Sequence, residues 1–213
     1  MSNSGTDESK RGDEMAQPAE EKPKMIVPVG YENLGPLEPL LCLGGKVSKG
    51  FQRGSKLLGI PTANIPVEDE ENPEQQVLVE KLEAGIYFGW AQLYKEKVPS
   101  ADEIDEEDED NFEGLVLKTV VSVGWNPYFK NEKKTVEPHI IHTFEQDFYD
   151  YYIRVVLCGY LRPELDFTSM DALIDAIKKD IELSTKLLDE DAYASAKTHE
   201  FFPVLKSKDE SAA

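Results

Sequence analysis

The stretch Ala84-Gly85-Ile86-Tyr87-Phe88-Gly89-Trp90-Ala91-Gln92-Leu93-Tyr94 is the clearest strand signal in the chain. Ile86, Phe88 and Trp90 recur with a period of two, so one face of this segment carries large apolar side chains. Such alternation is typical of a strand in a sheet, because successive side chains point to opposite faces.

Four further runs rich in Val, Leu, Ile and aromatic residues predict strands on either side of it. They are joined by turns and loops, without helices between them, which predicts a mainly β protein. We expect a single closed antiparallel β-barrel, Greek-key-like and of about six strands, with one C-terminal α-helix packed on it. The four runs are residues 41–48, 114–125, 135–144 and 151–161.

The C-terminal part of the chain predicts a helix. Thr168 followed three residues later by Asp171 resembles a capping box, and apolar residues then recur at helical spacing. Residues 192–202 predict a short second helix. The acidic stretch after Pro66 predicts a loop. The apolar face of the long helix, which we expect to seal the barrel, consists of Leu173, Ile174, Ile177, Ile181 and Leu188.

Polar segments set the limits of the domain. Residues 1–24 have few large apolar side chains and predict a disordered tail, and residues 206–213 predict a frayed end. Eight acidic residues between 102 and 110 predict a disordered, self-repelling insertion at about 96–113. One domain is therefore expected at residues 25–205.

The charge of the chain narrows its partners. With 23 Lys and Arg against 42 Asp and Glu, the net charge is −19, which disfavours nucleic acids and anionic membranes. No apolar run approaches 18 residues and the N-terminus carries no secretory signal, so we expect a cytoplasmic protein, with association at an organelle surface left open. The distant cysteines Cys42 and Cys158 predict free thiols in a reducing compartment.

Residues 50–64 read Gly-Phe-Gln-Arg-Gly-Ser-Lys-Leu-Leu-Gly-Ile-Pro-Thr-Ala-Asn and predict a phosphate site. Three glycines allow tight turns whose backbone N–H groups can surround an anion. Arg53 and Lys56 add positive charge, and no Asp or Glu occurs from Pro39 to Val67. The chain carries neither the P-loop motif nor G-x-G-x-x-G, so a nucleotide would be bound by a different scaffold.

Thr62 and Asn64 follow Pro61 at a spacing of two. If this segment is extended, the hydroxyl and amide oxygens point the same way and can ligate Mg²⁺. Two neutral oxygens hold this ion weakly, so we expect the metal to arrive with the phosphates of a nucleotide. The same oxygen ligands are also compatible with Zn²⁺ or Mn²⁺ as the bound metal.

At this point the sequence resembles the riboflavin kinase, or flavokinase, family over residues 41–202, apart from the acidic insertion. The resemblance is carried by five ordered blocks, and Gln52 departs from it where another Gly is expected. The blocks are residues 50–64, Gly85-Ile86-Tyr87-Phe88-Gly89-Trp90, Ser122-Val123-Gly124-Trp125-Asn126-Pro127-Tyr128-Phe129-Lys130-Asn131, Glu137-Pro138-His139-Ile140-Ile141-His142-Thr143-Phe144, and Gly159-Tyr160-Leu161-Arg162-Pro163-Glu164.

Glu137 and His139 lie on one face of the predicted strand 135–144. A carboxylate beside an imidazole can orient a hydroxyl group and accept its proton. The same pair is also compatible with an ordinary solvent-facing strand. The resemblance implies that Glu137 is the catalytic base that activates the ribityl hydroxyl, and that His139 lies beside the nucleotide.

The resemblance implies the remaining site residues as well. It places Thr62 and Asn64 at the metal and ATP, Gly50 and Lys56 in the phosphate-binding loop, and Arg162 at the flavin. A salt bridge at a strand end is the other interpretation of Arg162. Phe167 is the aromatic residue that we expect to contact the flavin.

The expected activity is the ATP-dependent phosphorylation of riboflavin to FMN by a monomeric enzyme with a divalent metal. About forty residues precede the barrel, too few for the adenylyltransferase domain fused to some family members. We therefore expect synthesis to stop at FMN. Two alternatives are a non-catalytic flavin- or nucleotide-binding barrel that stores or delivers FMN and, less compatible with the acidic charge, an oligonucleotide-binding barrel.

Overall fold

The computed structural model describes residues 30–31, 34–48, 60–68, 72–95, 114–125, 133–145, 147–149 and 151–202. The predicted tail, acidic insertion and C-terminal end, and the loop with Gly50 and Lys56, lie outside these residues. The described part contains one five-stranded antiparallel sheet with the order β1-β5-β2-β3-β4. Its strands are β1 (Gly35–Lys46), β2 (Gly85–Tyr94), β3 (Val116–Trp125), β4 (Lys134–Ile140) and β5 (Tyr152–Pro163).

The two central strands, β2 and β5, are buried on both faces. On the concave face, Tyr87, Leu93 and Leu157 belong to one apolar core, and on the convex face Phe88 and Trp90 belong to a second. The backbones of the two strands are close enough that a Cβ at position 89 would lie 2.0 Å from the carbonyl oxygen of Val156, so Gly89 is required there. Both cores are thus organised around the β2–β5 pair.

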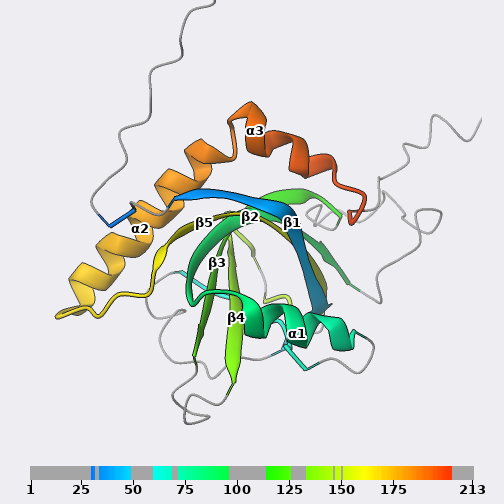
Figure 1. Cartoon of the computed structure of the whole chain (residues 1–213), viewed down its shortest axis with the longest axis horizontal. Helices are drawn as coiled ribbons and strands as arrows, with labels where there is room; N and C mark the ends of the chain where they lie inside the picture. The colour runs from blue at the N-terminus through cyan, green and yellow to red at the C-terminus, as the bar shows by residue number, and fades with distance from the viewer. Residues whose placement is uncertain are drawn as a thin grey trace, which may run out of the picture.

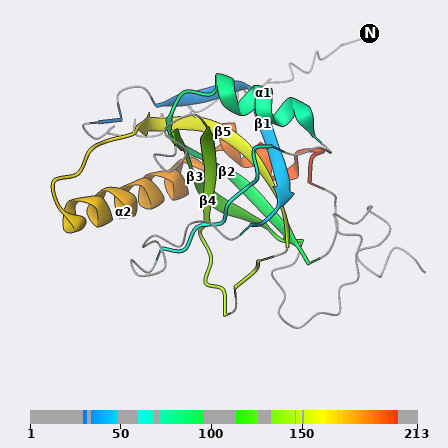
Figure 2. The same cartoon turned by 90° about the horizontal axis from the view of Figure 1, so that it is seen from below.

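Helices lie on both sides of the sheet (Figures 1 and 2). α1 (Pro73–Lys81) crosses the concave side, where Val79 enters the core. α2 (Met170–Leu187), α3 (Asp191–Ala194) and the 3₁₀ turn η2 (Ser195–Thr198) cover the convex side, as predicted for the C-terminal helices. The cap of α2 is Ser169, whose hydroxyl accepts a hydrogen bond from the Ala172 N–H at 3.2 Å, so the prediction of Thr168 was wrong by one residue.

The prediction of a loop after Pro66 was wrong, because α1 begins within that stretch. The helix has no apolar stripe that a sequence pattern could reveal, since its buried residues are only Gln75 and Val79. Pro73 is in the first turn, where its missing N–H leaves no helical hydrogen bond unmade. The expectation that no helix separates the strands was therefore also wrong.

The predicted closed barrel is not what the structure has, because the five-stranded sheet is open, with β1 and β4 as its edges. A short extended strip, residues 63–65, lies between these edges. It forms only two isolated bridges, from Asn64 to Ser48 after β1 and from Ile65 to Val136 of β4. Pro61 and Pro66 flank the strip and cannot donate backbone hydrogen bonds, which keeps it from extending into a sixth strand.

The cysteines and the helices bear on two further predictions. Cys42 and Cys158 are free thiols, as predicted, and Cys158 is buried. Among the described helices, none combines the length and apolar character needed to span a membrane. The cytoplasmic location and the monomeric state stay predictions.

Gln75 ties α1 to the sheet and provides a test of this arrangement. Its side-chain oxygen accepts a hydrogen bond from the Gly44 N–H at 2.7 Å, and its amide donates to the Pro66 carbonyl at 2.9 Å. Gln75→Leu leaves both backbone groups without these partners and should lower the free energy of unfolding by about 1–3 kcal/mol in denaturant titrations. The matched control is Gln76→Leu, whose amide contacts only the exposed Glu80 and which should change stability little. Equal stability of the two variants would contradict this role.

Candidate functional site

One row of side chains crosses four strands on the convex face of the sheet. Arg162 of β5 lies opposite Ile86 of β2, Ile86 opposite Ser122 of β3, and Ser122 opposite Glu137 of β4. Directly opposed residues in an antiparallel pair project to the same face. The predicted base and the predicted flavin contact therefore lie on one surface, at the two ends of this row.

The strip 63–65 extends this surface past β4. Backbone N–H groups of Ala63 and Ile65 donate to the carbonyls of Pro138 and Val136, at 2.8 and 3.0 Å. This register puts Asn64 opposite Glu137. One step along the strip, Thr62 comes opposite His139. The structure thus brings together four residues that the sequence analysis had named from separate motifs.

Glu137 is half-buried at the centre of this group. The Thr135 hydroxyl donates a hydrogen bond to its Oε1 at 3.2 Å, and the Thr62 side chain also hydrogen-bonds to it. Burial raises the pKa of the Glu137 carboxyl above its ordinary value, while the two threonine hydrogen bonds oppose that rise. A carboxylate with a raised pKa is a better proton acceptor than an exposed one.

The imidazole of His139 is held in one tautomer. Its Nδ1 lies 2.8 Å from the carbonyl oxygen of Pro61, which can only accept, so Nδ1 carries the proton. Burial lowers the pKa of His139 more than this hydrogen bond raises it. The neutral ring then presents Nε2 as an acceptor, so His139 contributes polarity to the site without positive charge.

A pocket of about 300 Å³ lies between this surface and α2, and we call it the helix-side pocket. Glu137, His139 and Thr62 line one part of it, and Arg162 and Phe167 line another. Apolar side chains from the sheet and the helix complete its walls, among them Ile86, Val120, Leu173 and Ile177. Apolar walls combined with polar and charged groups at defined positions are typical of a site for a small organic molecule.

Arg162 makes the salt bridge that one interpretation of the sequence had offered. Its Nε and Nη2 donate to Oδ1 and Oδ2 of Asp180 at 2.8 and 2.6 Å, and both residues are buried. The guanidinium carbon also lies 6.0 Å from the centre of the Phe167 ring. Since Arg162 lines the helix-side pocket as well, the salt bridge fixes a cation in the pocket wall.

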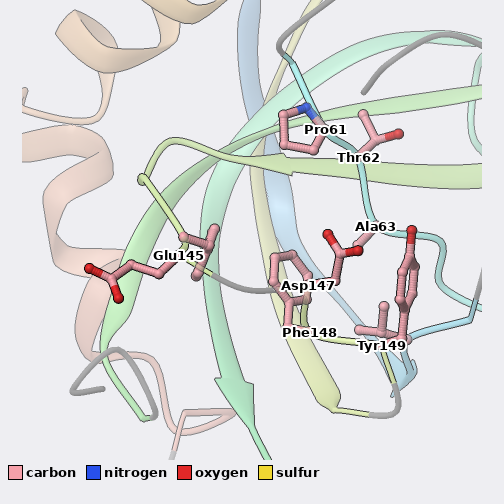
Figure 3. A pocket seen from close by; sticks show the side chains of 9 residues that line it. Pro61, Thr62, Ala63, Glu145, Asp147, Phe148 and Tyr149 are labelled. Atoms are coloured by element: carbon pink, nitrogen blue, oxygen red, sulfur yellow. The ribbon is translucent and has the colours of Figure 1, made fainter. Parts of the chain in front are cut away.

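A second pocket, of about 250 Å³, lies on the other side of Thr62, and we call it the loop-side pocket (Figure 3). Pro61, Thr62 and Ala63 form one wall, and the chain around Phe148 and Tyr149 forms the facing wall. Thr62 lines both pockets, and Glu137 lines the helix-side pocket. The arrangement offers space for one molecule on each side of Thr62.

The sequence analysis missed several residues of these pockets. Ser122 was part of a quoted motif but received no role, and Leu173 and Ile177 were assigned only to sealing the sheet. Glu164 also lines the helix-side pocket, and its carboxylate lies so close to Gly124 that a side chain at position 124 would displace it. The succession of aromatic residues at 144–149 was the one available signal for the loop-side pocket.

Comparisons with known proteins agree with one another. A family model described as riboflavin kinase matches residues 38–188. Riboflavin kinase of Mus musculus is 46% identical over 170 residues, covering 80% of this chain and 94% of the mouse protein, and the Homo sapiens enzyme is 45% identical with the same coverage. The crystal structure of riboflavin kinase from Trypanosoma brucei covers 78% of this chain and 90% of its own, with a TM-score of 0.56 and 24% identity, and shows the shared fold.

Proposed function

Because this chain belongs to the riboflavin kinase family, and so phosphorylates riboflavin with ATP as co-substrate, we propose how its residues divide that work. Glu137 removes the proton from the terminal ribityl hydroxyl. Thr62 and Asn64 bind the nucleotide and its metal, with His139 beside them. Arg162 and Phe167 contact the flavin. The observation that carries this proposal is that Thr62 lines both pockets, while Glu137 and Arg162 line the helix-side pocket.

The helix-side pocket suits riboflavin better than the loop-side pocket. The flavin is a large, flat and mostly apolar ring system with a polar ribityl chain. The helix-side pocket offers an aromatic ring, Phe167, and apolar walls at one end, and the carboxylate of Glu137 at the other. A flavin placed along it directs its ribityl hydroxyl to that carboxylate. The loop-side pocket is then the site of the nucleotide. There the rings of Phe148 and Tyr149 can pack against its base.

Proton removal at this position fits the chemistry of phosphoryl transfer to an alcohol. The hydroxyl oxygen attacks the γ-phosphorus as its proton passes to the Glu137 carboxylate, the bond to the β-phosphate oxygen breaks, and ADP leaves. Thr135 and Thr62 orient the carboxylate through hydrogen bonds. The neutral Nε2 of His139 can accept a further hydrogen bond without drawing a counter-charge to the site.

The residues present fit a divalent cation that arrives with the nucleotide. Within the part of the chain that the structure describes, no group of three or more His, Cys, Asp or Glu is placed to hold a metal. The Thr62 hydroxyl and Asn64 amide supply neutral oxygens, the donor type that Mg²⁺ takes when phosphates and water complete its shell. A bound Mg²⁺ would neutralise charge on the β- and γ-phosphates. The loop with Gly50 and Lys56 is proposed to surround those phosphates.

The base is tested by Glu137→Gln, which keeps the shape and removes the proton acceptor. We expect kcat to fall by about 10²–10⁴ with the KM for ATP nearly unchanged, measured by chromatographic detection of FMN. The acid limb of the wild-type pH profile should lie above pH 4.5, because burial raises the Glu137 pKa and activity is lost as pH falls through it. The control is Glu182→Gln on the exposed face of α2. A Glu137→Gln enzyme with normal kcat would remove the assignment.

Asn64→Ala tests the metal site. The loss of one ligand should raise the Mg²⁺ concentration for half-maximal activity by about tenfold, roughly the contribution of one good ligand to a weak site. Riboflavin binding, followed by flavin fluorescence, should not change. Asn72→Ala, at the exposed start of α1, is the matched control. If the activity of both variants depends on the concentrations of Mg²⁺, Mn²⁺ and Zn²⁺ as that of the wild type does, Asn64 is not a metal ligand.

The two pockets are tested by a crossed pair of variants. Phe167→Ala should raise the KM for riboflavin by about tenfold and leave the KM for ATP within twofold, because one aromatic contact contributes about 1–2 kcal/mol. Tyr149→Ala should do the reverse. The opposite pattern in steady-state kinetics would exchange the substrates between the pockets.

A further inference from the structure

Tyr31 lies outside the region shared with the family model, which begins at residue 38. It precedes β1, yet only 3% of its surface is exposed and it packs in the convex-side core beside α2. Its hydroxyl donates a hydrogen bond to Oδ1 of Asp180 at 2.6 Å. A residue 149 positions away in sequence therefore contacts the carboxylate that holds Arg162.

The Asp180 carboxylate is surrounded by donors from two directions. Oδ1 accepts from Tyr31 and from Nε of Arg162, and Oδ2 accepts from Nη2 of Arg162. With 2% of its surface exposed, Asp180 has little access to water, so these bonds replace hydration. Loss of the tyrosine hydroxyl would leave one lone pair of a buried anion without a donor, and the carboxylate would shift to recover one.

Any shift of Asp180 moves Arg162, because the two are joined by a bidentate pair. Three of the five guanidinium N–H groups are used within the described residues, two by Asp180 and one by the Pro163 carbonyl at 2.9 Å. The remaining two are on Nη1 and Nη2. Their direction depends on how the Asp180 carboxylate is fixed, and the same guanidinium lies over Phe167 in the pocket wall.

We propose that Tyr31 is a positioning residue for riboflavin, acting through Asp180 to hold the Arg162 guanidinium in the helix-side pocket. The inference rests on the proposed flavin role of that pocket. In this chain the segment ahead of β1 thereby becomes part of the substrate site, although it touches no substrate. The short segment that leads into β1 passes beside α2, which carries Asp180 (Figure 1).

The test is Tyr31→Phe in the full chain, which keeps the ring in the core and removes only the hydroxyl. We expect the KM for riboflavin and the dissociation constant from flavin fluorescence to rise about three- to tenfold, in the range for the net contribution of one ordinary hydrogen bond, because the effect reaches the substrate indirectly. The KM for ATP and kcat should stay within twofold. Assays are run well below the melting temperature of each variant, so that fluorescence titration reports binding per folded molecule.

Tyr193→Phe is the matched control, because Tyr193 is buried in the same core and does not line the pocket. A purely structural role for Tyr31 predicts that both variants lose thermal stability and keep the riboflavin constants of the wild type, which would overturn the inference. The Tyr31→Phe, Asp180→Asn double variant should bind riboflavin no worse than Asp180→Asn alone. Independent, multiplying losses would show that Tyr31 does not act through Asp180.

Arg162→Ala separates this inference from the proposed function. If Arg162→Ala leaves the riboflavin constants unchanged, the pocket assignment itself fails. If Arg162→Ala raises them at least tenfold while Tyr31→Phe has no effect, the pocket assignment survives and the role of Tyr31 is rejected.

Discussion

The hydrogen-bonded pairing of β2 with β5 is the interaction on which the rest of this structure depends. Both strands are buried on both faces, so each core, concave and convex, is attached to the same pair of backbones. Their close approach at Gly89 leaves no space for a side chain. Because β3 and β4 are added to β2 in register, the position of Glu137 at the far edge is fixed by a pairing two strands away.

The predicted base, Glu137, is at an edge of the sheet for a physical reason. Most central positions are covered by α2 and α3 on one side and by the concave core on the other, although Ile86 of β2 and Arg162 of β5 still line the helix-side pocket. At β4 the sheet is lined by the helix-side pocket instead of being packed against α2. Glu137 is therefore half-buried, between solvent and core. The same partial burial that admits a substrate also raises the Glu137 pKa.

Strand periodicity made part of this arrangement predictable. Alternation in residues 135–144 put Glu137 and His139 on one face, and the register of β4 confirms it. Periodicity could not show that Asn64 lies opposite Glu137, because that depends on the isolated bridge between Ile65 and Val136, two segments more than 70 residues apart. The roles of these residues were suggested by family resemblance and not by spacing. The contact of Tyr31 with Asp180 spans an even larger separation and carries no local pattern. α1 was missed because its apolar residues, 77–79, are consecutive and form no helical stripe, and the barrel was predicted closed because the strands were expected to be joined by loops alone.

The backbone of the strip at 63–65 and the side chains next to it have different roles. Its backbone N–H groups satisfy carbonyls on the outer side of β4, where Pro138 has no N–H to offer, and so cover an edge that would otherwise be open to pairing with another chain. Its neighbouring side chains, Thr62 and Asn64, face the site. One short peptide therefore serves both purposes: its backbone protects the sheet edge from association, and the side chains of the residues beside it face the substrate site. Ala63 and Ile65 are held by the concave core, so of the side chains in and next to the strip those of Thr62 and Asn64 are the ones that can follow the chemistry of the site.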